Sequence, residues 1–115
     1  MTSTEKESVK RIEVEWGDRF ARLASHVSPV MIETLVRHVV HGTPTGSFLQ
    51  SVLENNLVES FGRADEQNLA AMRYWAITIG LDMPAGSWGS RENVAQWCES
   101  GGLLGMGRRS EESKV

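Results

Sequence analysis

A chain of 115 residues is long enough for one domain with its own core and too short for two. Forty per cent of the residues are hydrophobic and 23% are charged, a globular composition that argues against wholesale disorder. The net charge is −3, and residues 29–100 carry four basic and eight acidic side chains, so nucleic-acid binding through neutralised phosphates is not expected.

The N-terminal third predicts a disordered segment followed by a helix. Residues 1–8 are polar and are expected to be disordered. From Val9 onward, apolar residues recur at helical spacing, at Val9, Ile12, Trp16, Phe20, Leu23 and Val27. Residues 11–16 also alternate between apolar and charged, which is typical of a half-buried strand. We favour the helix, because the helical spacing continues past Gly17 and the chain offers no second strand to pair with.

Two amphipathic helices are expected next, joined by the short loop HGTPTG. Ser28 and Pro29 are a helix start, with Ser as N-cap and Pro at the first position, and this helix should end near Val40. A second apolar stripe predicts one continuous helix from Ser47 to about Phe61, through Phe48, Leu49, Val52, Leu53, Leu57 and Phe61. Because the loop is short, we expect the two stripes to bury each other.

The remaining elements follow from caps and breakers. Asp65 is the expected N-cap of a helix that ends at Gly80, and Ser90 caps a last helix over residues 91–100. The loop between them carries Trp88, which we expect to plug the core. Residues 101–115 are rich in glycine and are expected to form a flexible tail. The sequence therefore predicts an all-α protein, a compact bundle of four to five short helices, with a single domain over residues 9–100.

The loop at residues 41–48 is the candidate ligand site. Glycines that lead into a helix N-terminus gather free backbone N–H groups, which attract anions. Hydroxyl groups and one basic side chain could add to such a site, so the candidate residues are His41, Gly42, Thr45, Gly46, Ser47, Phe48 and Arg63. The expected ligand is a small anion such as a nucleotide. A turn filled by Pro44 and capped by Thr45 explains the same residues without a ligand.

Catalytic and metal chemistry find little support in the pattern. His38 and His41 are spaced to share a helix face, but no third metal ligand is indicated, and an interaction with the helix C-terminal dipole suffices. Cys98 lies beside Trp97 on an apolar face, which is typical of a buried small hydrophobe and, as the only cysteine, it excludes an internal disulfide. We predict no catalytic residue, metal or cofactor, and no enzyme activity.

A helix-turn-helix over residues 29–60 is the DNA-binding alternative. The linker of six residues is longer than the motif uses, and the second helix has no Arg or Lys to hold phosphates. The acidic balance of the middle of the chain disfavours it too.

Three stretches resemble a group of small proteins encoded by bacteriophages and prophages: HGTPTGSFLQSVLEN, RADEQN and SWGSRENVAQW, within residues 30–97. In that group Asn-Asp stands where this chain has Asn55 and Asn56. The resemblance implies a viral origin. Because no membrane span or signal-peptide layout is present, the expected location is the cytoplasm of the bacterial host. We expect a non-enzymatic accessory protein that inhibits or sequesters a host component, a protein or a nucleotide signal of an antiviral system. The alternative is a structural or DNA-transaction accessory factor of the phage.

Self-association and membrane insertion are the last two expectations. Short helices with eight aromatic residues leave more apolar surface than one small core covers, so a homo-oligomer is expected. The sequence has neither an apolar run of membrane-spanning length nor a signal-peptide layout, so no membrane partner is expected.

Overall fold

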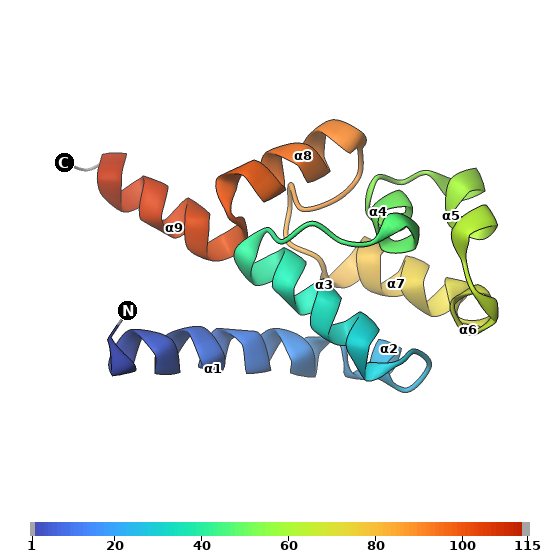
Figure 1. Ribbon diagram of the computed structural model, residues 1–115, viewed down its shortest axis with the longest axis horizontal. Helices are drawn as coiled ribbons and strands as arrows, with labels where there is room; N and C mark the ends of the chain where they lie inside the picture. The colour runs from blue at the N-terminus through green and yellow to red at the C-terminus, as the bar shows by residue number, and fades with distance from the viewer. Residues whose placement is uncertain (1, 114–115) are drawn as a thin grey trace.

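The computed structural model describes residues 2–113, with side chains up to Gly107, and this part of the chain is all-α with no strand (Figure 1). The predicted fold class is confirmed. Nine helices follow one another in the described residues, more than the expected four to five because several predicted helices are broken in two. Their bounds are α1 Ser3–Arg19, α2 Ala21–Ala24, α3 Pro29–His41, α4 Ser47–Leu53, α5 Leu57–Arg63, α6 Glu66–Ala70, α7 Met72–Asp82, α8 Arg91–Ser100 and α9 Gly102–Ser113.

Helix α3 lies in the middle of the molecule. It packs against α1 on one side and α9 on the other, while α4 packs against α5, α7 and α8 (Figure 1). Buried side chains from α1, α2, α3, α4, α7 and α8 form one continuous core. The largest of its fully buried members are Trp75, Phe20, Leu23, Leu35, Leu49 and Leu53. This core fixes the relative positions of the helices that carry the sites described below.

The helix prediction for residues 11–16 is confirmed, and α1 begins six residues earlier than expected. Thr2 is its N-cap and accepts a hydrogen bond from the backbone N–H of Glu5 at 3.1 Å. Residues 3–8 are therefore helical although their side chains are exposed. The cap and the intrinsic helix preference of Glu and Lys explain why this polar segment is not irregular.

The predicted starts of three other helices are confirmed. α3 begins at Pro29 after an extended Ser28, whose side chain makes no capping bond. Asp65 caps α6 by accepting from the N–H of Asn68 at 2.8 Å, and Ser90 caps α8 by accepting from Asn93 at 3.0 Å. The sequence predicts these helix starts because an N-cap acts over only three residues.

The predicted continuous helix over residues 47–61 is wrong. α4 ends at Leu53, and a new helix begins at Leu57. Asn55 lies in the left-handed region with φ 62°, and Asn56 caps α5 by accepting from the N–H of Glu59 at 3.2 Å. Asparagine tolerates left-handed backbone and caps helices well, so two consecutive asparagines can end one helix and begin the next.

The expected pairing of the stripes flanking residues 42–46 is also wrong. α3 packs on α1 and α9, and α4 packs on α5 and α7, although both helices contribute to the common core. The connecting segment crosses the molecule without regular structure (Figure 1). Five such residues can span about 15 Å or more, so a short connection did not force the helices side by side.

The C-terminal segment is helical where a flexible tail was expected. Gly101 ends α8 in the left-handed conformation with φ 81°, and α9 covers Gly102–Ser113. Leu103 and Leu104 pack against the core and against α3. Because the apolar surface that orders this segment comes from residues far away in the sequence, its own pattern does not predict the helix.

Candidate functional site

The seven predicted ligand residues are divided between separate places. His41 ends α3, and its Nε2 lies 3.2 Å from a carboxylate oxygen of Glu13 in α1. Gly42 is buried in the left-handed conformation with φ 70°, where an added Cβ would lie 2.6 Å from the backbone nitrogen of Gly102. Both residues are therefore occupied by contacts within the fold, at the far end of the loop from Gly46.

Four of the predicted residues do come together. Gly46, Ser47, Phe48 and Arg63 line one cavity of about 310 Å³, whereas Thr45 faces a different one of about 150 Å³. Arg63 donates to the Ser47 carbonyl at 3.2 Å and pairs with Glu59 at 3.2 Å, and the carboxylate of Asp65 lines the same cavity. The guanidinium is thus partly engaged, and a carboxylate opposes an incoming anion.

The two histidines that are spaced for a metal site have different partners: His38 contacts the Ser87 carbonyl, and His41 contacts Glu13. Among the described residues no group of three or more His, Cys, Asp or Glu side chains could hold a metal ion. His38 is fully buried, and burial lowers its pKa below the ordinary value. Cys98 packs partly buried against the core, and burial raises the pKa of its thiol. A thiol with a raised pKa is a poor nucleophile, so Cys98 is not activated by its neighbour His38.

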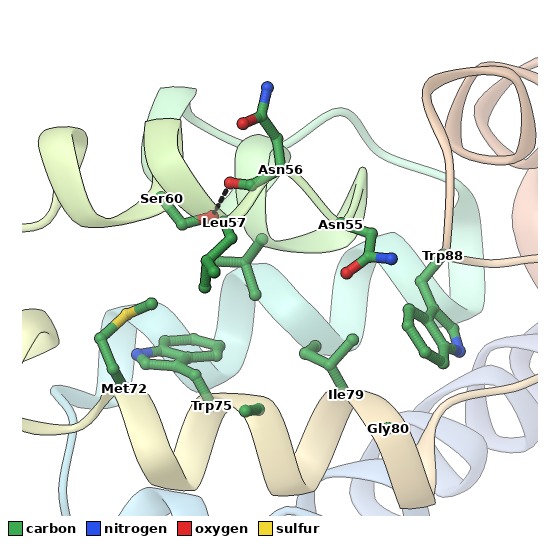
Figure 2. Close-up of a pocket in the computed structure, with 11 residues that line it drawn as sticks. Asn55, Asn56, Leu57, Ser60, Met72, Trp75, Ile79, Gly80 and Trp88 are labelled. Carbon is green, nitrogen blue, oxygen red and sulfur yellow. Dashed lines mark hydrogen bonds between the residues drawn. The ribbon is translucent and has the colours of Figure 1, made fainter.

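An apolar groove of about 270 Å³ lies between α5 and α7, and no sequence pattern predicted it (Figure 2). Met72, Trp75 and Ile79 rise into it from α7, and Leu57 faces them from the start of α5 (Figure 2). Trp88 closes one end, as part of the loop between α7 and α8. The lining described by the structure contains no ionisable side chain; its polar members are Asn55, Asn56 and Ser60. We call this cavity the α5–α7 groove.

Next to the groove, the apolar side of α5 faces solvent. Leu57 is 68% exposed, Val58 81% and Phe61 47%. Their spacing puts them on one side of the helix, while Glu59 and Arg63 pair on the other side. An amphipathic helix normally buries its apolar stripe against its own core, but α5 buries Ser60 and leaves the stripe outside. Leu57 belongs both to this stripe and to the groove, so the two form one surface.

The sequence pattern does not reveal this surface, because it predicts a single long helix over residues 47–61. In a continuous helix Leu57 and Phe61 would follow Leu53 towards the core, whereas the break at Asn55 and Asn56 turns α5 and exposes them. The asparagine pair before Leu57 is the signal that could have indicated the break.

Trp75 supplies the rigid floor of the groove. It is fully buried, its indole N–H donates to the Asn68 side chain at 3.1 Å, and Phe48 packs against it edge-on with ring centroids 5.7 Å apart. A floor held by a buried hydrogen bond and aromatic packing keeps its shape when a partner enters or leaves.

Comparisons of the chain with protein-family models, with curated proteins and with solved structures found no match. Of the helices described, none combines the length and the apolar character needed to cross a membrane.

Proposed function

We propose that this protein acts by binding, with the α5–α7 groove and the exposed side of α5 as the surface that takes an apolar segment of another protein. The observation that supports the proposal is the apolar stripe of α5, which faces solvent beside an uncharged groove. Contiguous exposed apolar surface with a polar rim is typical of protein interaction sites. No charged side chain has to be desolvated in the groove when a partner binds, so an apolar helix or side chain suits it.

We propose a bacterial host protein as the partner, and inhibition or sequestration of that protein, in an antiviral system, as the outcome. The resemblance of residues 30–97 to phage-encoded proteins supports this choice. A structural or DNA-transaction role in the phage is the alternative. The cavity at Gly46, Ser47 and Phe48 supports an anionic ligand such as a nucleotide less well, because Arg63 is partly engaged and Asp65 faces the cavity.

The test compares two matched substitutions, Val58→Asp and Val30→Asp. Both valines are exposed, at 81% and 66%, and both occupy the second position of a helix, α5 and α3 respectively. Aspartate in a first turn suits either helix dipole, so neither change should unfold the protein. Only Val58 lies on the proposed surface.

The immobilised wild-type protein and Val30→Asp should retain the same bacterial protein from lysate, and Val58→Asp should lose it. The captured protein is then purified and its affinity measured by calorimetry, where Val58→Asp should weaken binding by about tenfold or more, equivalent to about 1.4 kcal/mol. Equal affinity for both variants would exclude this surface as the binding site.

A further inference from the structure

His38 connects two loops that are distant in the sequence. Its Nε2 lies 2.9 Å from the carbonyl oxygen of Ser87, and its Nδ1 lies 3.3 Å from the carbonyl oxygen of Thr43. The indole N–H of Trp97 in turn donates to the His38 carbonyl at 2.7 Å. The ring, which is fully buried, thus contacts the loops 42–46 and 83–90, and the His38 backbone carbonyl ties α8 to the end of α3.

Both ring nitrogens face acceptors, and a neutral imidazole has only one N–H to donate. The shorter contact, to Ser87, requires the proton, so Nε2–H donates to Ser87 and Nδ1 faces the Thr43 carbonyl without a proton. The Cys98 thiol lies 4.0 Å from Nδ1 and can donate a weak S–H bond to it. A second proton on the ring would let Nδ1–H donate to the Thr43 carbonyl, but it would place a positive charge in the core.

Among the described side chains, no carboxylate is in hydrogen-bond contact with the His38 ring. Cys98 on α8 is the titratable group near the ring, and the loops 42–46 and 83–90 carry no ionisable side chain. His41, one turn further along α3, is directed to Glu13 instead. The charged residues of α8, Arg91, Glu92 and Glu99, are exposed. Desolvation therefore outweighs the two carbonyl contacts, and the pKa of His38 is lowered.

The Ser87 contact matters for the groove, because Ser87 directly precedes Trp88, which closes one end of it (Figure 2). The same loop is tied to α4 by a hydrogen bond from the N–H of Gly89 to the Leu53 carbonyl at 2.7 Å. Ser87 is itself fully buried, and its hydroxyl donates to the Pro84 carbonyl at 2.7 Å. His38 is the side chain that anchors this turn to α3.

We propose that His38 is an acid-sensitive latch on the α5–α7 groove: proton uptake by the ring releases Ser87 and frees the loop that carries Trp88. The proposal rests on the proposed function, because it describes regulation of the same groove. A protonated ring gains hydration when the loop opens, and opening breaks the Ser87 contact and moves the wall of the groove. Acidification should thus loosen the binding surface.

The direction of the pH dependence follows from the linkage between proton binding and loop opening. With a folded-state pKa below the ordinary 6.5, the closed form is fully favoured above pH 6.5 and loses stability as the pH falls from 6.5 to the lower, folded value. One proton changes the opening equilibrium by at most about tenfold per pH unit across that window. The loop 83–90 should therefore open more often at mildly acidic pH, and no more often between about pH 7 and 8.

The test is amide hydrogen exchange of the free protein, read by mass spectrometry on peptides from residues 83–90 and corrected for intrinsic exchange rates. Wild type and the control His41→Gln should show an opening constant that rises up to about tenfold per pH unit below pH 6.5. His38→Gln, whose amide can still donate to Ser87 but does not titrate, should show a flat profile. A flat wild-type profile, or an unchanged pH dependence in His38→Gln, overturns the proposal.

A measurement on the wild type alone covers the case in which His38→Gln does not fold. Titration of the His38 ring followed by NMR should give a pKa below 6.5, and a value at or above 6.5 overturns the latch. Neither measurement uses a partner protein. Failure of Val58→Asp to weaken partner binding would thus refute the proposed function and leave the exchange result to decide the latch separately.

Discussion

At the scale of single residues, two glycines allow a close backbone approach between α3 and α9. Gly42 and Gly102 meet backbone to backbone, with φ of 70° and 68°, where α3 ends and α9 begins. An added Cβ on Gly42 would lie 2.6 Å from the nitrogen of Gly102 and 2.8 Å from the carbonyl oxygen of Trp97. These are backbone atoms that cannot move without shifting a helix, so the contact requires glycine for both space and conformation.

Gly42→Ala should therefore destabilise the protein by about 2 kcal/mol or more, which lowers the melting temperature by roughly 8 °C or more. Gly17→Ala is the matched control: it lies within α1, nothing lies within 4 Å of its added Cβ, and it should stabilise by about 0.5–1 kcal/mol. Thermal unfolding by circular dichroism compares the two. If Gly42→Ala melts with the wild type, α9 does not dock on α3 as described.

At the scale of elements, much of the helical pattern could be predicted and the turns between helices could not. The starts at Pro29, Asp65 and Ser90 follow from residues within one helical turn. The helix α9 and the reorientation of α5 depend on contacts with distant residues, which spacing alone does not reveal. For the candidate site, the sequence predicts the grouping of four residues that line one cavity: Gly46, Ser47, Phe48 and Arg63. It does not predict the α5–α7 groove, because its pattern indicates one continuous helix over residues 47–61.

The break between α4 and α5 depends on Asn55. Among the described residues, it is the one that adopts a positive φ without being glycine. Asn55→Gly should leave stability close to that of the wild type, because glycine adopts this conformation readily. Asn55→Ala should cost about 1–2 kcal/mol, since the Cβ of alanine disfavours the left-handed region and cannot make the local hydrogen bonds of asparagine. Urea unfolding of both variants measures the difference. Equal stability of the two would argue that the chain does not need a left-handed residue here.

At the scale of the whole molecule, we propose that the exposed side of α5 and the adjoining groove take a second copy of the chain. In a two-fold dimer each Val58, 81% exposed, can enter the partner's groove while the reverse contact forms simultaneously. Without another protein bound, burial of this apolar surface in a dimer lowers its contact with water. Self-association and partner binding would then compete for one surface.

We therefore expect the wild type and Val30→Asp to form a dimer and Val58→Asp to form a monomer. The substitution places a carboxylate in an uncharged, apolar interface, where its desolvation is not repaid by a partner charge. Light scattering coupled to size-exclusion chromatography distinguishes a monomer of 12.8 kDa from twice that mass. A wild-type monomer at high concentration would rule out self-association and leave the groove free for another protein. A dimer that survives Val58→Asp would place the self-contact on a different face.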